Sequence, residues 1–594
     1  MKKIYADYFV LICLVIVVLF TQSCKKSGSF LSETTTTNLT QATVFADSSR
    51  TEGFLANIYA SAGFAVSASR FQSSTFIVCG GLDAACDESE PSHPYATDAS
   101  GFATGTINAG TVSIDPYNTC YTQIRAVNQL LANIHLTKML ASNKAQVVAE
   151  ARFLRAWYYS ILVEAYGGVP LVGNNLYTYS TPIPVVRSTY AQCITYITSE
   201  CDSMAAILPL TQGGLNYGRA SGGACLALKA RMLLYAASPL FNGTTLPQDA
   251  GSSSSGPVPA ALVGYPTADP TRWQLAEAAA QAVIASGAYS LNTSNTYQDT
   301  IAGYGFQGLF PQRVNSEYIF ALMRLPNDDL ENLFLPPSRD GANGAFPYEG
   351  FLEAFPMSNG KLITDPTSGY DPTNPYANRD PRLNYSIIHD QTVLNIRNGS
   401  GLIAGQSPVD IYLGNGNDQN PDAVHQGTYT GYYCNKMLDP SVVANSLAFK
   451  TNRCLPLIRY AEILLDYAEA ANENEGPTTL VYNAIQAIRQ RAGLNPFQLP
   501  SGLSQAQMRT YIQNERRIEL AFEGNRFFDV RRWKIAPVTD NIQGQGMEID
   551  RNGTAVTYNK FNLTKHNFRA AMYLWPFPLS ETGKSASLIQ NPGY

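Results

Sequence analysis

The sequence has little charge. Of its 594 residues, 15% are Asp, Glu, Lys or Arg, and the formal net charge is −5, whereas about 25% of residues are charged in an average soluble protein. Nucleic-acid-binding proteins carry an excess of Lys and Arg to neutralise phosphates, so we expect no nucleic-acid partner. The polar surface must come from uncharged groups, and the chain is rich in Tyr (35), Gly (45) and Pro (34). This composition favours a neutral, hydroxylated ligand.

Histidine is also scarce. The five histidines are isolated from one another, and no HExxH or comparable ligand spacing occurs. Zinc sites are typically built from ligands at short, regular intervals. The chain also lacks a GxSxG nucleophile elbow and a P-loop. The sequence therefore predicts neither a metal centre nor a cofactor.

The N-terminus is typical of an export signal. Lys2 and Lys3 precede an apolar run from Phe9 to Phe20, which is followed by "TQSC" ending at Cys24. The run is too short to span a bilayer as a permanent helix. We expect residues 1–23 to be a signal peptide.

The end of this signal resembles a bacterial lipobox, in which the cysteine becomes a lipidated N-terminus. Ser23 is the expected small residue before Cys24, whereas Thr21 and Asp7 depart from the usual pattern. Cys24 is the predicted lipidation site, and a soluble secretory signal is the alternative. Residues 24–40 are polar and rich in helix breakers, as expected of a flexible tether.

The remaining cysteines show no CxxC and no regular spacing. In an exported protein, Cys79 and Cys86 could close a small loop as a disulfide. Buried free thiols are the alternative.

Apolar residues recur every three or four positions along most of the mature chain. In residues 51–63, Phe54, Leu55 and Ile58 fall on one face, and a long stretch at 145–168 ends on two glycines. Further amphipathic stretches lie at about 121–136, 188–208, 223–238, 272–286, 457–473, 479–492 and 504–522. The pattern predicts a mainly α fold of stacked helical hairpins, similar to tetratricopeptide repeats.

Two segments break this pattern. Residues 64–114 and 288–450 are rich in Gly, Asn, Pro, Asp and Tyr, with only short strand-like pieces such as "SEYIFALM". Long irregular segments in compact proteins are usually functional or disordered, and the aromatic content argues against disorder. We expect these segments to form an irregular, aromatic-rich face on the helical body.

Charge is concentrated in one stretch, "ERRIELAFEGNRFFDVRRW" at residues 515–533. Its glutamates, at four-residue intervals on the expected helix, could supply the carboxylate pair of a glycoside hydrolase. However, neighbouring arginines lower a carboxylate pKa, which opposes general-acid catalysis, and the interleaved aromatics favour burial. We therefore predict a structural ion-pair network of Glu515, Arg516, Glu519, Glu523, Arg526, Asp529 and Arg531, with a surface hydrolase using Glu519 and Glu523 as the alternative.

The same stretch carries a resemblance to a known family. "NERRIELAFEGNRFFDVRRWK" resembles the signature of the SusD/RagB family of Bacteroidetes outer-membrane lipoproteins, and "ARFLRAWYYSILVEAYGGVPLV" (151–172) resembles its other hallmark. Similarity continues at 272–291, 457–473, 487–494 and the closing "YLWPFPLSE...LIQNPGY", in family order. The resemblance covers essentially the whole mature chain.

This resemblance implies a fold and a role. Family members have an α-helical body of four tetratricopeptide-like hairpins plus a variable irregular portion. They lie at the cell surface and cap a SusC-like TonB-dependent transporter, to which they hand glycans without cleaving them; some serve peptides or other nutrients. We accordingly expect one domain at 41–594, with a helical body at about 41–63, 115–290 and 455–535, a ligand face at 64–114 and 288–450, and a C-terminal segment at 536–594.

A neutral sugar offers apolar C–H faces and many hydroxyls. Its receptor needs exposed aromatic rings together with hydrogen-bonding side chains. Residues of these types gather in two stretches of the expected ligand face. The predicted ligand-binding residues are Arg70, Asp83, Asp87, Tyr95, Tyr304, Phe306, Arg324, Asn327 and Asp328.

Overall fold

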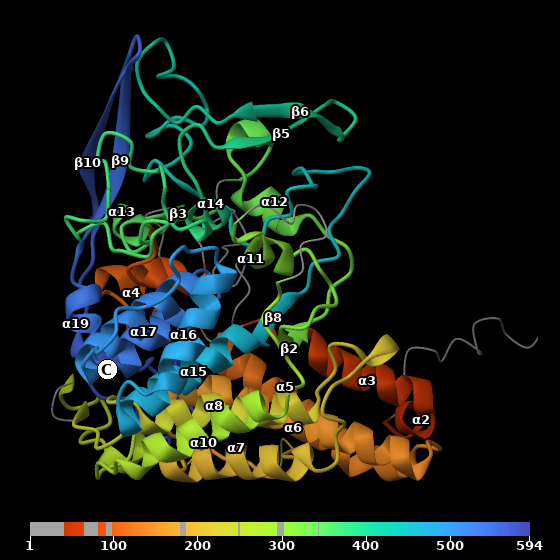
Figure 1. Cartoon of the computed structure of the whole chain (residues 1–594). Helices are drawn as coiled ribbons and strands as arrows, with labels where there is room; N and C mark the ends of the chain where they lie inside the picture. The colour runs from red at the N-terminus through yellow and green to blue at the C-terminus, as the bar shows by residue number, and fades with distance from the viewer. Residues whose placement is uncertain are drawn as a thin grey trace, which may run out of the picture.

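The computed structural model describes residues 41–64, 81–90, 98–113, 115–178, 186–246, 250–293, 302–342 and 344–594. The predicted lipidation site Cys24 and the predicted ligand residues Arg70 and Tyr95 lie outside these residues, as does Cys79. The described chain forms a layer of long helices beneath a loop-rich layer (Figure 1). Among the described residues, no helix combines the length and apolarity needed to cross a membrane.

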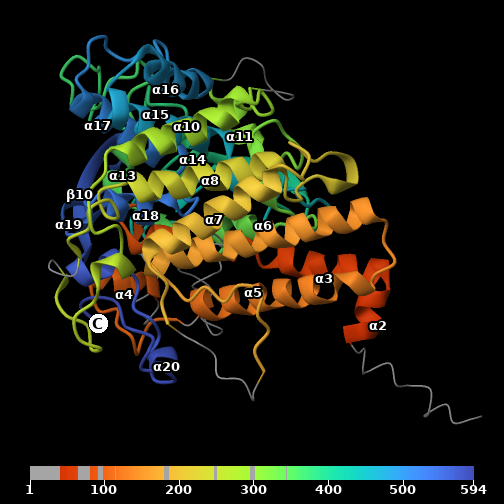
Figure 2. The same ribbon diagram turned by 90° about the horizontal axis from the view of Figure 1, so that it is seen from below.

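The helical layer is a continuous array. Each long helix packs against the next: α5 against α6, α6 against α7, α7 against α8, and α8 against α10, as Figure 2 shows from below. The bounds are α2 (Gln41–Ala46), α3 (Ser48–Ala60), α5 (Asp115–Asn133), α6 (Ala141–Tyr166), α7 (Tyr190–Ala205), α8 (Gly222–Ala237) and α10 (Thr271–Ala285).

Local sequence signals fix the ends of these helices. Gly167 stops α6 because it adopts a φ of 76°, which side-chain-bearing residues disfavour. The following Gly168 lies so close to Ser188 that a Cβ there would come within 2.2 Å of the carbonyl oxygen of Ser188. Thr189 then starts α7 with a capping box completed by Gln192.

The irregular segment is inserted into a helix pair. Helix α10 packs against α15 (Tyr460–Glu475), although residues 286–459 separate them in the sequence. Helix α15 also packs against α16 (Thr479–Arg491) and α17 (Gln505–Glu519). The predicted mainly α fold of packed helix pairs is confirmed.

The two ends of this insertion meet in a short sheet. Strand β2 (Tyr318–Leu322), which falls in the predicted "SEYIFALM" strand, pairs antiparallel with β8 (Leu455–Arg459). This pair forms a stem between the helical layer and the loops above it (Figure 1).

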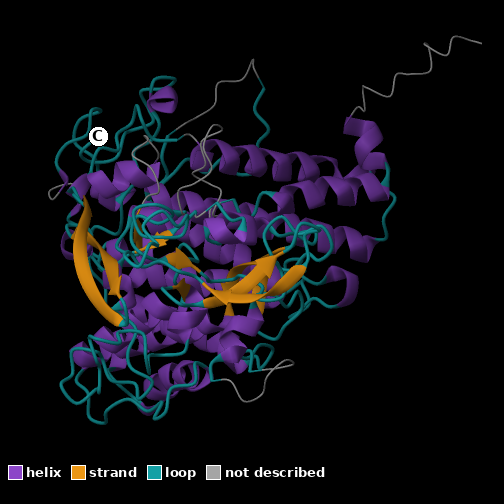
Figure 3. Ribbon diagram, turned by 90° about the horizontal axis from the view of Figure 1, so that it is seen from above, coloured by secondary structure: helices purple, strands orange, loops and turns teal. Residues whose placement is uncertain are grey.

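The remaining described strands and helices are mostly short (Figure 3). The strand pairs are β1 (Ser89–Glu90) with β3 (Phe346–Pro347), β4 (Ile387–Ile388) with β7 (Tyr433–Cys434), β5 (Val393–Arg397) with β6 (Ile403–Pro408), and β9 (Gln543–Asn552) with β10 (Ala555–Lys565). The short helices are α4 (Asp98–Thr104), α11 (Tyr304–Leu309), α12 (Asp329–Phe334), α13 (Glu349–Leu352), α14 (Arg382–Ser386), α18 (Asn525–Arg532), α19 (Ala536–Thr539) and α20 (Leu579–Thr582).

The insertion has its own hydrophobic core. Phe306, Phe334 and Tyr433 belong to a buried cluster separate from the cluster around Trp157 and Trp575 in the helical layer. Burial of large apolar side chains stabilises each cluster by about 1.5–3 kcal/mol per side chain. The loops of the insertion therefore rest on a packed base.

Two expectations need correction or completion. We predicted a helix over 504–522, but α17 ends at Glu519 because Phe522 and Gly524 take positive φ values of 56° and 79°. Glu523 therefore lies in a turn and not on the helix face.

Cys86 is a buried free thiol that donates a hydrogen bond to the carbonyl oxygen of Asp83 (3.4 Å), which favours the thiol alternative at this residue.

Candidate functional site

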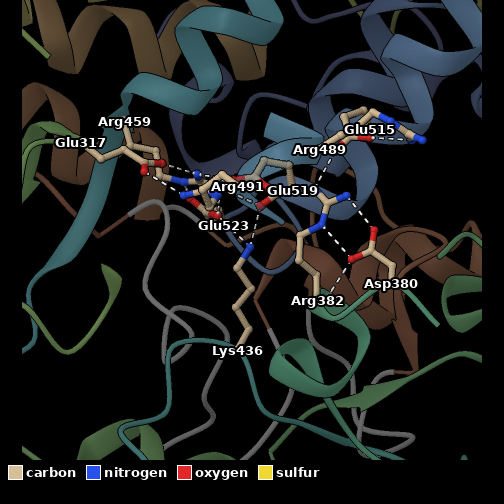
Figure 4. Close-up of polar contacts among 10 residues, drawn as sticks. All are labelled: Glu317, Asp380, Arg382, Lys436, Arg459, Arg489, Arg491, Glu515, Glu519 and Glu523. Carbon is tan, nitrogen blue, oxygen red and sulfur yellow. Dashed lines mark hydrogen bonds and ion pairs between the residues drawn. The ribbon is translucent and has the colours of Figure 1, made fainter. Parts of the chain in front are cut away.

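A buried ion-pair network lies where the insertion meets the helical layer (Figure 4). Glu519 is 0% exposed. Its carboxylate accepts hydrogen bonds from Arg382 (2.9 Å) and Arg459 (2.7 Å), and it also pairs with Arg491. These arginines come from α14, the end of β8 and α16 respectively. One carboxylate thus ties together three segments far apart in the sequence.

Glu317 and Lys436 extend this network into the insertion. Glu317, just before β2, accepts from Arg459 (2.8 Å) and from Arg491 (2.9 Å). Lys436 donates to Glu523 (2.8 Å). The network therefore holds the β2–β8 stem in place where it joins the helical layer.

Each residue of the predicted network forms an ion pair. The pairs are Glu515 with Arg382, Arg516 with Asp466 and Asp529, Glu519 with Arg382, Arg459 and Arg491, Glu523 with Arg459 and Lys436, Arg526 with Asp87, and Arg531 with Asp540. Most of the opposing partners lie outside the charged stretch.

These surroundings disfavour Glu519 as a general acid. Burial alone would raise the pKa of Glu519, but the three arginines around it hold the pKa well below its usual range. A general acid needs a raised pKa and access to its substrate. Glu519 has neither, so the Glu519–Glu523 pair is no longer our candidate for hydrolysis.

Near the network, the pKa of Glu88 is shifted in the opposite direction from that of Glu519. Glu88 is 0% exposed, and neither carboxylate oxygen has a hydrogen-bond partner within the described part of the chain. Burial, reinforced by the neighbouring carboxylate of Asp83, raises the pKa of Glu88 well above its usual value. Folding therefore favours the protonated form of Glu88.

We expect Glu88→Gln to stabilise the protein in a pH-dependent way. Because the folded-state pKa is raised, the wild-type protein loses stability as the pH rises from the unfolded value of about 4.3 towards the folded value. The amide avoids this cost, so the variant should be about 1–3 kcal/mol more stable at pH 8 and equal near pH 4. Denaturant unfolding across this range measures the difference.

The exposed Glu475→Gln is the matched control for this prediction. A Glu88→Gln gain that does not change with pH would contradict the raised pKa.

The candidate ligand site is a cavity of about 410 Å³ within the insertion. Its lining includes the β5–β6 hairpin and the loop 435–443. It also includes Gln307 of α11, Glu331 of α12 and Tyr385 of α14. The hairpin is held to the loop by Asn395, whose amide donates to the carbonyl oxygen of Pro440 (2.7 Å).

Uncharged amides dominate the polar lining of this cavity. They are Gln307, Asn384, Gln391, Asn395, Gln406 and Asn435. No Lys or Arg lines the cavity in the described part of the chain. Amides both donate and accept hydrogen bonds, as hydroxyls do. The lining is thus complementary to an uncharged polyol.

The two carboxylates at this site are partly occupied by the protein. Both oxygens of Glu331 accept from Arg453 at 2.7 Å, and one also accepts from the backbone N–H of Asp439. The Asp439 side chain caps Ser441 through its backbone N–H and hydroxyl. In contrast, the Gln307 side chain makes no hydrogen bond to another described residue. Gln307 is therefore available to a ligand.

The rings of Tyr385 and His389 line the cavity. Burial, with a smaller effect of the neighbouring Tyr304, raises the pKa of Tyr385 to about 12, so its hydroxyl stays protonated and donates to the carbonyl oxygen of Ala302 (2.9 Å). His389 stacks on Tyr376 with ring centroids 4.1 Å apart. These contacts hold the rings in place before any ligand arrives.

A larger cavity of about 620 Å³ lies outside this site, between α3, the loop 215–219 and β2. Its lining includes Leu55, Leu215, Leu322 and Met323. This lining has fewer uncharged polar side chains than the first cavity. The amide-lined cavity in the insertion is therefore the better match for a hydroxylated ligand.

The structure buries four of the predicted ligand-binding residues. Asp83, Asp87, Phe306 and Asp328 are all buried. Asp87 forms a two-point ion pair with Arg526 (2.8 Å each). A side chain held inside the fold cannot reach a surface ligand.

Phe306 and Asp328 have specific internal partners. The ring of Phe306 lies under the ammonium of Lys436, 4.8 Å from the ring centroid. Asp328 accepts from Lys450 (3.0 Å) and from the backbone N–H of Ser446 (3.1 Å). Both residues therefore support the insertion.

Three other predicted ligand-binding residues, Tyr304, Arg324 and Asn327, are not among the residues that line the cavity. Arg324 pairs with Asp329, and Asn327 donates to the carbonyl oxygen of Leu325 (2.8 Å). Tyr304 is half-buried on α11, the helix that also carries Gln307. Of these two residues on α11, only Gln307 lines the cavity.

The chain matches known proteins at the level of whole families. The chain matches the family model described as the SusD family over residues 286–594, more than half of its length. Residues 83–234 match a second model, described as starch-binding associating with outer membrane.

One individual relative agrees with these matches. A SusD-like protein P2 of Formosa agariphila is 33% identical over 143 residues, which cover 23% of this chain and 25% of that protein. The match thus spans about a quarter of the curated relative's length.

Solved structures are similar over nearly the whole chain. A SusD-like protein from Bacteroides fragilis has a TM-score of 0.72 at 24% identity, covering 93% of this chain and 98% of that one. A SusD-like carbohydrate-binding protein from the same species has a TM-score of 0.69 at 22% identity, covering 92% and 100%. At these identities the likeness shows a shared fold.

Proposed function

Since this chain belongs to the SusD family, we propose that it is a lipid-anchored glycan-binding protein of the cell surface. In this role it captures oligosaccharide or polysaccharide and delivers it, without cleaving it, to a SusC-like TonB-dependent transporter in the outer membrane. Cys24 would carry the lipid, and residues 24–40 would form the tether to the membrane.

The observation that carries this proposal is the amide-lined cavity in the insertion. It has room for about 410 Å³ of ligand, polar groups that match hydroxyls, and aliphatic side chains such as Leu438 and Val442 that match C–H faces. The carbohydrate-binding title of one structural neighbour and the starch-binding description of the second matching model support the same ligand class.

The division of the fold supports delivery to a partner. The cavity lies in the loop-rich layer, whereas the long helices form a separate layer (Figure 1). The helical layer can therefore contact the transporter while the cavity holds glycan.

Calorimetry of the mature protein against a panel of neutral glycans tests the proposal. We expect saturable binding to at least one of them, with no release of reducing ends during long incubation. Failure to bind any member of a broad panel would count against a glycan ligand, and release of reducing ends would overturn the non-catalytic role. Co-purification of a TonB-dependent barrel with the tagged protein from its native membrane tests the partner.

A further inference from the structure

His389, on the wall of the ligand cavity, faces two hydrogen-bond acceptors. Its Nδ1 lies 2.9 Å from the carbonyl oxygen of Asp390, and its Nε2 lies 3.0 Å from Oδ1 of Asn384. Stacking on Tyr376, with an angle of 14° between the rings, fixes the plane of the imidazole. His389 and Asn384 both line the cavity.

Proton counting limits how these groups can be arranged. A carbonyl oxygen only accepts, so Nδ1 must carry a proton. A neutral imidazole has one N–H, which leaves Nε2 as an acceptor facing the amide oxygen of Asn384. Two acceptors at 3.0 Å do not form a hydrogen bond. The contact between Nε2 and Oδ1 therefore requires a doubly protonated ring. Alternatively, the Asn384 amide is rotated by half a turn, which exchanges its oxygen and nitrogen without changing its shape.

The surroundings of His389 favour the neutral ring. Burial lowers the pKa of His389, and the positive charge of Arg379 lowers it further, against the opposing effect of Asp390. Among the other groups facing the ring, Asp390 is paired with Arg551 (2.6 Å), and burial raises the pKa of Tyr376. At neutral pH, Asn384 must then donate from Nδ2 to His389, and its oxygen is left for the cavity.

We propose that His389 sets the hydrogen-bonding polarity of the ligand cavity through Asn384. With a neutral His389, Asn384 presents its oxygen and accepts from the ligand; with a protonated His389, it presents its NH₂ group and donates. The inference rests on the proposed glycan-binding function and deepens it. His389 is a positioning residue in this scheme, and Asn384 is the residue that contacts the ligand.

This polarity defines a ligand class. At neutral pH the cavity offers the oxygen of Asn384 beside the carboxylates of Glu331 and Asp439, with no Lys or Arg lining it in the described part of the chain. Hydroxyls can donate to such a site, whereas sulfate esters can only accept. The cavity therefore selects neutral, hydroxyl-bearing sugars over sulfated ones, and acid weakens that selection.

The first test needs no ligand. Nitrogen NMR of the full mature protein, labelled with ¹⁵N-histidine, is recorded at pH 7.5, and His389 is assigned from the spectrum of His389→Phe, which keeps a ring against Tyr376. We expect a neutral His389 protonated at Nδ1. An Nε2–H tautomer, or a doubly protonated ring at pH 7.5, would overturn the inference. His135→Gln, which removes an exposed histidine on the short turn after α5, is the control for assignment.

The second test measures selectivity by calorimetry, with laminarihexaose and O-sulfated laminarihexaose as probes. We expect the ratio of their affinities to fall by about tenfold between pH 7.5 and the pH at which the nitrogen spectrum shows His389 doubly protonated. In His389→Phe the ratio should not change with pH. In Asn384→Asp, whose carboxylate accepts, the ratio should stay high at that lower pH. Asn384 is exposed, so this variant does not depend on refolding the core.

The outcomes separate the two proposals. A wild-type ratio that is constant with pH, or a pH dependence that persists in His389→Phe, would overturn the role of His389. If neither probe binds at any pH, the glycan-binding proposal fails for these ligands, and the tautomer measured by NMR still decides the arrangement of His389.

Discussion

Glu519→Gln should prevent the protein from accumulating in folded form. The substitution removes the charge that faces Arg382, Arg459 and Arg491 while changing little in volume. Each arginine side chain, which is at most 1% exposed, would keep its positive charge. Breaking a buried ion pair in this way costs about 3–5 kcal/mol, which is a large share of the 5–15 kcal/mol that stabilises a typical protein.

The effect should also spread beyond the pair. Glu519 connects α17 to α14, to α16 and to the end of β8, so its loss loosens the base of the insertion. Soluble expression and thermal unfolding of the purified variant measure the result. Glu475→Gln, on an exposed position at the end of α15, makes the same chemical change without an ion pair and should behave as wild type. A Glu519→Gln protein that melts within a few degrees of wild type would show that the network contributes little.

Gln406→Trp should weaken ligand binding strongly while leaving the fold intact. Gln406 is exposed on β6 and lines the cavity, where it donates to Asn395 (3.0 Å). An indole at this position fits a strand and would occupy part of the cavity. We expect affinity to fall on the order of 100-fold, which corresponds to about 2.7 kcal/mol.

The control for this variant is Gln543→Trp, which places the same side chain on an exposed strand position of the β9–β10 hairpin. Calorimetry with a glycan identified from the panel should show unchanged affinity for the control. Retained affinity in Gln406→Trp, with an unchanged melting temperature, would move the ligand site away from the insertion.

The helical layer could be predicted because burial there imposes a period on the sequence. The expected stretches at 188–208, 223–238 and 479–492 correspond to α7, α8 and α16 within a few residues. The inner end of the insertion was likewise visible in the apolar "SEYIFALM" strand. The β9–β10 hairpin was missed, although Asn552 and Gly553 form a turn dipeptide that favours hairpins.

The ligand cavity could not be predicted residue by residue. Its amides come from α11, α14, β5, β6 and two loops, and no periodic pattern relates them. Phe306 and Gln307 illustrate the difficulty. They are neighbours on α11, yet Phe306 packs into the core and Gln307 lines the cavity, so the choice depends on how a short helix is rotated.

The ion-pair network was partly predictable from the composition of one stretch. The density of Glu and Arg in one stretch indicated internal pairing, because so many charges among aromatics cannot all face water. The partners Arg382, Arg459 and Glu317 lie far away in sequence and carry no local signal. They come together only when the insertion folds against the helical layer.

The division of one helix pair by the insertion also bears on biosynthesis. Ala276, Ala280 and Val283 of α10 are buried in the finished protein, and α10 packs on both α8 and α15. Residues 286–459 precede α15 in the chain, so the surface of α10 that faces α15 stays uncovered until α15 is available. Such late, long-range closure slows folding and exposes the chain to aggregation. A polypeptide truncated before residue 460 should therefore be a substrate for chaperones and proteases, and not a smaller binding protein.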